Sequence, residues 1–295
     1  MDLIQALILS IIEGLTEFLP ISSTAHMIFV SSIYGTQDDE FVKMFQVSIQ
    51  FGAILSVVAL YWKKFFNFKS FNFYIKLALA VIPALILGKL FDDKIEAILE
   101  SPIPIAIVLI VGGVILLFVD RLFKNPTIKK EENISIGKAI TIGFWQCLAM
   151  MPGTSRSAAS IIGGMQQGLS RKLAAEFSFF LAVPTMLAVT MYSVFLKDWN
   201  LEPTIAQQKS MTPLKVDFLG KTYEVYQSIS QKGYEMILSS SQNISNFIIG
   251  NIIAFIVAAL AIKLFIGILE KYGFKIWGWY RIVVGIILIT YFSLQ

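Results

Sequence analysis

The chain has 295 residues, of which 56% are hydrophobic and only 15% are charged, and its mean hydropathy is +0.71. Because roughly a quarter of the residues of a soluble domain are charged, this composition excludes an ordinary soluble protein. The net charge of +4 is small, and Lys and Arg fall mostly in short loops, which indicates membrane topology and no nucleic-acid partner. A single cysteine, Cys147, excludes an internal disulfide framework and a zinc site built from cysteines.

Six apolar stretches have the length of a transmembrane helix. About 20 apolar residues suffice to cross a hydrocarbon core ~30 Å thick as a helix. The predicted spans, in chain order, are roughly 45–62, 75–91, 103–123, 177–196, 247–269 and 276–292. We therefore predict an all-α integral membrane protein that forms a single membrane domain over residues 1–295.

Two further apolar stretches, about 2–34 and 136–168, are interrupted by proline and hydroxyl residues. The first breaks at LPISST (19–24) and the second at MPGTSRS (151–157). Each half has only about 12–17 residues, too few to cross the membrane. We expect two re-entrant helix hairpins, because irregular backbone at that depth occurs only where protein or a wet cavity surrounds it.

The two interruptions also resemble each other at one spacing of 132 residues. The pairs are Pro20 and Pro152, Ser22 and Thr154, Ser23 and Ser155, and Phe45 and Phe177. This favours two repeats, about 1–124 and 133–295, each with one hairpin and three crossings. An odd number of crossings places the second repeat upside down, which is the inverted-repeat plan of many transporters. Chance similarity between apolar segments is the alternative.

Loop charges predict the orientation in the membrane. The basic segments 63–69, 121–138 and 171–172 fall on one side, and the acidic segments 36–40 and 92–100 on the other. The positive-inside rule makes the basic side cytoplasmic. Both termini, the open end of the first hairpin and a polar insertion at about 197–246 then lie outside.

Glu13 and Glu17 are four residues apart, so they share one face of a helix. Ionisable residues at membrane depth are costly and are functional candidates by default. A divalent cation between the two carboxylates would relieve their repulsion, and such oxygen ligands together with substrate phosphates suit Mg²⁺ or Ca²⁺. A pair of carboxylates at the membrane interface is the alternative.

The polar breaks also predict an anion site. Hydroxyls that follow Pro20 and Pro152 can cap the next half-helix, and a helix N-terminus offers free N–H groups to an anion. Arg156 adds a planar fork suited to phosphate. The predicted substrate-binding residues are Ser22, Thr24, Thr154, Ser155, Ser157 and, more weakly, Gln50. Simple capping by the hydroxyls, an ion pair of Arg156 with a glutamate, and helix-to-helix hydrogen bonding by Gln50 are the alternatives.

His26, the only histidine, lies about one turn after Ser23 and close to the carboxylates in sequence. This favours a role in the site over packing. Ser23 is our preferred nucleophile, with Glu17 or His26 as its base. Direct attack by His26 stays open as the second hypothesis.

The stretches EGLTEFLPISSTAHM (13–27), PGTSRSAASIIGGM (152–165) and AEFSFFLAVP (175–184) resemble the bacterial undecaprenyl-diphosphate phosphatases of the bacitracin-resistance type. The resemblance covers nearly the whole chain except the insertion. It implies a hydrolase of the bacterial cytoplasmic membrane that removes the terminal phosphate of a C55 polyprenyl diphosphate and returns the lipid carrier to cell-wall synthesis. It also implies a divalent cation and catalytic roles for five residues: Glu13, Glu17, Ser23, His26 and Arg156.

A lipid-phosphate transporter or flippase is the rival function, because inverted repeats and broken helices are typical of transporters. A carrier needs charge complementarity but no nucleophile, so the hydroxyl–histidine–carboxylate cluster favours the enzyme. The expected partners are the polyprenyl diphosphate and membrane lipids, with the active site facing outward. A homo-oligomer is compatible with the sequence, and the role of the insertion is left open.

Overall fold

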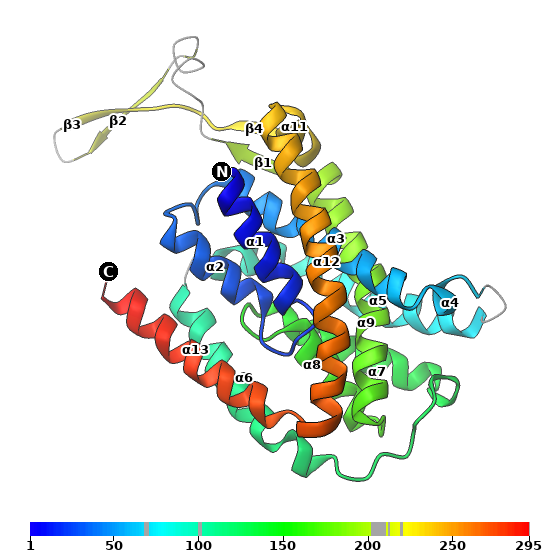
Figure 1. Ribbon diagram of the computed structural model, residues 1–295. Coiled ribbons are helices and arrows are strands. Elements are labelled where there is room, and N and C mark those ends of the chain that lie inside the picture. Colours follow the sequence, from blue (N-terminus) through cyan, green and yellow to red (C-terminus); the bar gives the residue numbers. More distant parts are fainter. Residues whose placement is uncertain (68–70, 100–101, 202–210, 212, 219–220, 295) are drawn as a thin grey trace.

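The computed structural model describes residues 1–67, 71–99, 102–201, 211, 213–218 and 221–294, with the backbone alone for 92–99, 214–218 and 221–225 (Figure 1). The side chains of the acidic segment 92–100, predicted to face outward, therefore lie outside the described residues.

The protein is an all-α, multi-pass membrane protein. Within the described part of the chain, six helices are long and apolar enough to cross a membrane, and they contain the six predicted spans or nearly all of each. They are α3 (Glu40–Leu60), α5 (Phe71–Leu99), α6 (Pro102–Leu122), α9 (Arg171–Met191), α12 (Ser241–Tyr272) and α13 (Lys275–Ser293). A π-helical turn, Tyr192–Leu196, extends α9.

Local chemistry sets where these helices begin and end. The Asp39 side chain accepts hydrogen bonds from the N–H groups of Phe41 and Val42 and so starts α3. Ser240 caps α12 in the same way, and Gly273, at a φ of 68°, ends it. Because of the Ser240 cap, α12 begins inside the stretch that the sequence assigned to the insertion.

Each of the two interrupted stretches forms two short helices around a break. The first stretch gives α1 (Leu3–Thr16) and α2 (Ser23–Ile33), and the second gives α7 (Ile136–Cys147) and α8 (Arg156–Gln166). A helix rises ~1.5 Å per residue, so the longest of these, with 14 residues, spans well under a bilayer core. The helix–break–helix form is confirmed, while its re-entrant placement in a membrane stays a prediction.

The polar insertion forms a small addition at one end of the helices (Figure 1). Strand β1 (Asp198–Leu201) pairs antiparallel with β4 (Ile229–Lys232), and β2 (Leu214–Phe218) pairs with β3 (Lys221–Val225). The short helix α11 (Gly233–Leu238) then leads into α12. Trp199 is buried and donates from Nε1 to the Ser193 carbonyl at 2.9 Å, which fixes β1 to the end of α9.

Several helix contacts occur twice if helices of the first half of the chain are matched with helices of the second half: α1 with α7, α3 with α9, α5 with α12 and α6 with α13. Helix α1 packs on α12 and α7 packs on α5, while α3 packs on α12 and α9 on α5. Helices α6 and α13, one from each half, pack on each other, as do α3 and α9. This pattern supports the predicted repeat, whose boundaries and inverted orientation remain predictions.

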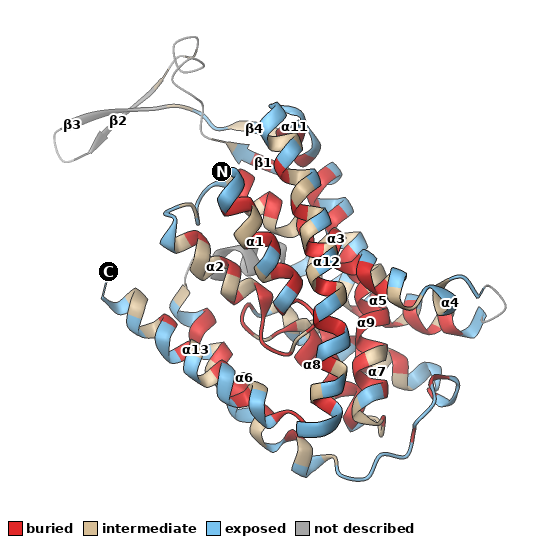
Figure 2. Cartoon of the chain, viewed as in Figure 1, coloured by how far each residue is buried: buried red, intermediate tan, exposed pale blue. Residues whose placement is uncertain are grey.

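Small residues allow the closest of these contacts. Gly143 on α7 faces the Ala80 backbone on α5, and Gly113 and Gly278 face each other's carbonyls between α6 and α13. Such close approaches replace the hydrophobic effect as a source of packing energy between helices in lipid. Figure 2 shows the buried residues gathered around the breaks and the exposed ones along α6 and α13.

Gly143→Ala should therefore destabilise the protein, because its Cβ would collide with the Ala80 backbone. Overpacking costs typically about 1–3 kcal/mol, so the thermal midpoint in detergent should fall. Gly137→Ala on the same helix is the matched control, since nothing lies within 4 Å of a Cβ there. Equal midpoints for the two variants would contradict the close packing of α5 and α7.

Candidate active site

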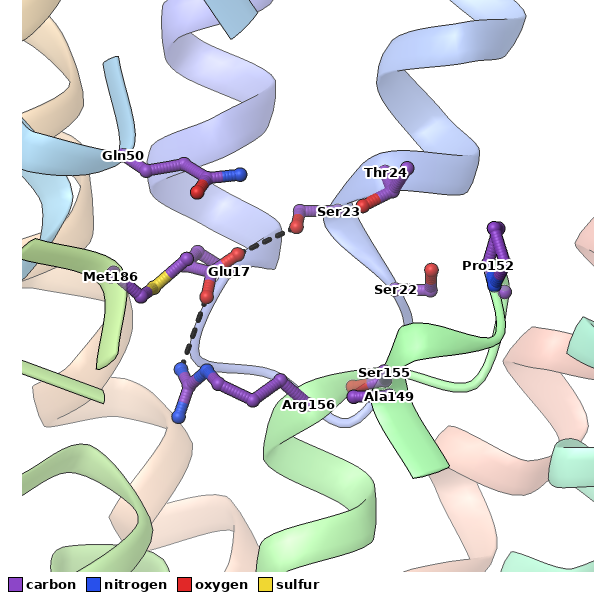
Figure 3. A pocket seen from close by; sticks show the side chains of 11 residues that line it. Glu17, Ser22, Ser23, Thr24, Gln50, Ala149, Pro152, Ser155, Arg156 and Met186 are labelled. Carbon is purple, nitrogen blue, oxygen red and sulfur yellow. Dashed lines mark hydrogen bonds and ion pairs between the residues drawn. The ribbon is translucent and has the colours of Figure 1, made fainter. Parts of the chain in front are cut away.

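The two breaks meet and form the floor of one pocket (Figure 3). Residues of both hairpins line the pocket, together with Gln50 of α3 and Met186 of α9. The lining residues of the hairpins are Glu17, Ser22, Ser23, Thr24, Ala149, Pro152, Gly153, Ser155 and Arg156. Segments more than 130 positions apart in the sequence therefore share one polar site within an apolar protein.

Both breaks end in a serine with an unusual backbone conformation. Ser22 has a φ of 69° and Ser155 a φ of 72°, and they are the non-glycine residues with positive φ in the described chain. Such conformations cost about 1–3 kcal/mol and gather at functional sites. Each serine caps the helix that follows, since its hydroxyl accepts from the N–H of Ala25 at 3.5 Å or Ala158 at 3.2 Å.

These caps correct the predicted alignment of the two breaks. Ser22 matches Ser155, so the spacing is 133 residues here, and Ser23 matches Arg156 rather than Ser155. The reason is one extra residue between the proline and the capping serine of the second break, where Gly153 and Thr154 stand in place of Ile21. The two half-helices thus begin with different groups, a hydroxyl on α2 and a guanidinium on α8.

Ser23, Glu17 and Arg156 form a connected cluster. The Ser23 hydroxyl donates to Glu17 Oε2 at 2.6 Å, and Arg156 Nη2 donates to Glu17 Oε1 at 3.0 Å (Figure 3). Arg156 Nη1 also donates to the Ser178 carbonyl at 3.0 Å, which fixes the guanidinium against α9. A serine hydroxyl bonded to a carboxylate is the arrangement that general-base activation of a nucleophile requires.

Glu13 lies one helical turn before Glu17 and is fully buried. Both of its carboxylate oxygens lack a hydrogen-bond partner in the described structure, and it does not line the pocket. A buried carboxyl group without a partner is costly unless a proton or a cation compensates it. With Glu17 nearby, Glu13 fits a divalent cation that takes its other ligands from phosphate oxygens or water. No cluster of three or more acidic, His or Cys ligands occurs among the described residues.

His26 points away from the pocket. Its Nδ1 lies 2.7 Å from the Ser22 carbonyl oxygen and its Nε2 lies 2.8 Å from the Tyr280 hydroxyl, with the two rings stacked. Because a carbonyl only accepts, Nδ1 carries the proton, and a neutral His26 accepts at Nε2 from Tyr280. The structure therefore brings Glu17, and not His26, to the Ser23 hydroxyl.

The predicted binding residues divide into two groups. Ser22, Thr24, Gln50 and Ser155 line the pocket, whereas Thr154 and Ser157 do not. The Ser157 hydroxyl is fully buried and donates to the Phe18 carbonyl at 2.8 Å, so it joins the second hairpin to the first break.

Two residues beside the site escaped the sequence analysis, Tyr280 and Arg281 on α13. Arg281 is fully buried and donates to carbonyl oxygens of both breaks. The sequence did contain a signal for Arg281, since an arginine inside an apolar span is a functional candidate. It contained no signal for the carbonyl groups that Arg281 bonds in the breaks, because they lie more than 120 residues away in the sequence.

Comparison with known proteins gives a consistent family. The family model for bacitracin resistance protein BacA matches residues 6–287. The chain is 52% identical to an undecaprenyl-diphosphatase of Flavobacterium psychrophilum, over 98% of this chain and 95% of that protein. It is 48% identical to one of Flavobacterium johnsoniae and 45% identical to one of Porphyromonas gingivalis, each over 98% of this chain and 96% of the relative. The chain belongs to the bacitracin resistance protein BacA family.

Proposed function

We propose that the protein hydrolyses undecaprenyl diphosphate to undecaprenyl phosphate and inorganic phosphate, and so returns the lipid carrier to peptidoglycan synthesis. The observation that carries the proposal is the Ser23–Glu17–Arg156 cluster in a pocket at the meeting of two helix N-termini. The relatives named undecaprenyl-diphosphatase support the substrate.

The pocket suits a diphosphate head group. Ser23 and Arg156 are the first residues of α2 and α8, where N–H groups have no partner within the helix. Two helix N-termini and a guanidinium therefore offer positive charge and donors to one anion. The polyprenyl tail would stay in lipid while the head group enters the pocket.

Ser23 is the nucleophile in this proposal. Its proton passes to Glu17, its oxygen bonds to the terminal phosphorus, and the bond from that phosphorus to the bridging oxygen breaks, releasing undecaprenyl phosphate. Glu17 gives that proton to the departing undecaprenyl phosphate and is a carboxylate again. Water then attacks the phosphoserine while Glu17 takes its proton, the bond from phosphorus to the Ser23 oxygen breaks, inorganic phosphate leaves, and Glu17 returns the proton to Ser23. Arg156 stabilises the charge on the transferring phosphoryl oxygens and holds Glu17 in position.

Glu13 and Glu17 are the proposed ligands of a divalent cation, Mg²⁺ or Ca²⁺. The partnerless oxygens of Glu13 support this assignment. When bound, the cation would neutralise charge on the phosphoryl oxygens of the substrate.

A lipid-phosphate transporter or flippase is the rival candidate, and the comparisons with known proteins do not favour it. The serine–carboxylate hydrogen bond and the names of the relatives favour the enzyme. We further propose that the protein lies in the bacterial cytoplasmic membrane with its pocket open to the outside, on the basis of the loop charges. A homo-oligomer is compatible with this function.

Purified protein in detergent should release phosphate from undecaprenyl diphosphate, and Ser23→Ala should lower turnover at least about 100-fold, since general-base activation contributes roughly that much. Ser32→Ala is the control, because the Ser32 hydroxyl on the same helix only bonds the Ile28 carbonyl. His26→Ala should keep measurable turnover. If His26→Ala loses its activity and Ser23→Ala keeps it, His26 is the nucleophile. If the wild-type protein releases no phosphate, the enzyme function is refuted and the transporter hypothesis remains.

Turnover should depend on a divalent cation. Excess EDTA should abolish phosphate release and added Mg²⁺ or Ca²⁺ should restore it. Glu13→Gln, which keeps the shape of the buried side chain, should raise the cation concentration needed for half-maximal activity. Glu132→Gln is the control, because the Glu132 side chain is 72% exposed and does not line the pocket. Full activity in excess EDTA would refute the cation proposal.

A cysteine at exposed Asp38, introduced after replacing Cys147, should react with a membrane-impermeant thiol reagent in intact cells. A cysteine at exposed Lys129 should react only after the cells are lysed. The reason is the excess of Lys and Arg in the loops on the Lys129 side. The reverse labelling pattern would invert the orientation.

A further inference from the structure

Arg281 is a fully buried cation whose partners are all backbone carbonyl oxygens. Nε donates to Leu109 at 3.0 Å, Nη1 to Thr154 at 2.9 Å and Pro20 at 3.3 Å, and Nη2 to Gly153 at 2.7 Å and Val108 at 3.5 Å. No carboxylate of the described residues forms an ion pair with it. A buried arginine is costly unless its donors are satisfied, and here all three nitrogens are used.

The accepting carbonyls come from three separate parts of the chain. Val108 and Leu109 belong to α6, Pro20 belongs to the first break, and Gly153 and Thr154 belong to the second. Gly112 on α6 makes room for the guanidinium, because a Cβ at that position would collide with it. One side chain thus ties both breaks to the α6–α13 pair.

The hydrogen bond to Thr154 also orients a donor of the pocket. No peptide bond of the described chain is cis, so the Thr154 carbonyl and the Ser155 N–H point in opposite directions. Arg281 donates a hydrogen bond to the Thr154 carbonyl, and the Ser155 N–H has no hydrogen-bond partner among the described residues. Ser155 lines the pocket, so this N–H is placed as a donor to an anion there.

We propose that Arg281 is a positioning residue for phosphate binding. It holds the two breaks in register and turns the Ser155 peptide so that its N–H faces the phosphate of the substrate. This proposal rests on the proposed function for the identity of the substrate, but the anion binding that it predicts can be measured without turnover. Arg281 touches no substrate and acts through the backbone of Thr154 and Ser155.

Arg281→Lys keeps the charge but cannot reach three chain segments, because an ammonium lacks the planar fork. In purified protein, its kcat/KM for a prenyl diphosphate should fall at least tenfold. The dissociation constant of inorganic phosphate, obtained from the shift of the thermal midpoint with phosphate concentration, should rise about tenfold. Arg121→Lys, at an exposed arginine on α6, is the matched control and should change neither value.

Gly112→Ala displaces the guanidinium while Arg281 is kept, so it should weaken phosphate binding in the same direction. Its control is Gly267→Ala on α12, where a Cβ meets nothing within 4 Å. If Arg281→Lys does not fold, Gly112→Ala carries the test. The thermal midpoint of each variant and its shift on adding phosphate separate lost binding from lost stability.

An unchanged dissociation constant for phosphate in a folded variant, Arg281→Lys or Gly112→Ala, would overturn the proposal and leave Arg281 a purely structural residue. If wild type binds phosphate more tightly than both variants but hydrolyses no prenyl diphosphate, the positioning role stands and the proposed enzyme function fails. Loss of both phosphate binding and turnover in the variants, with both controls unchanged, supports the proposal.

Discussion

The structure depends on one constraint, the need to satisfy backbone groups where helices break inside an apolar protein. Lipid offers no hydrogen bonds, so irregular backbone at membrane depth must find partners in the protein or in water. Here the breaks lie against each other, and their carbonyls accept from Arg281 and from the Ser157 hydroxyl. The carbonyls are thereby drawn into the protein, and N–H groups of Ser23, Ser155 and Arg156 are left at the pocket. The proposed anion site follows from how the hydrogen-bonding groups of the breaks are satisfied.

The buried charges follow from the same constraint. Each charged side chain at membrane depth costs roughly 2.5–3.5 kcal/mol or more, yet Glu13, Glu17, Arg156 and Arg281 all lie largely or fully buried in or beside the hairpins. Glu17 and Arg156 compensate each other, and Arg281 is compensated by carbonyl dipoles. Neither carboxylate oxygen of Glu13 has a hydrogen-bond donor among the described residues, which is the physical reason to expect a cation beside it.

The two halves of the chain share a backbone plan but contribute different chemistry. Ser22 and Ser155 adopt the same strained conformation and cap the next helix in the same way. The first half then supplies the carboxylates and a hydroxyl, and the second supplies the guanidinium. Neither half has the complete cluster, because the proposed nucleophile Ser23 and its proposed base Glu17 belong to the first hairpin, and Arg156, which bonds to Glu17, belongs to the second.

The sequence alone determined the six spans and the two breaks, because apolar length and helix capping are local properties that are read within about 20 residues. It grouped Arg156 with Glu17 and Ser23 only through the similarity of the two breaks and the family resemblance. It placed Ser23 opposite Ser155, one residue from the true match, because the difference in length between the breaks is hidden in their irregular backbone. Only the tertiary structure decided that His26 turns toward Tyr280, that the buried oxygens of Glu13 have no hydrogen-bond donor among the described residues, and that Arg281 joins the breaks. These facts depend on packing between segments far apart in the chain, above all on where α13 lies, and no local pattern encodes such contacts.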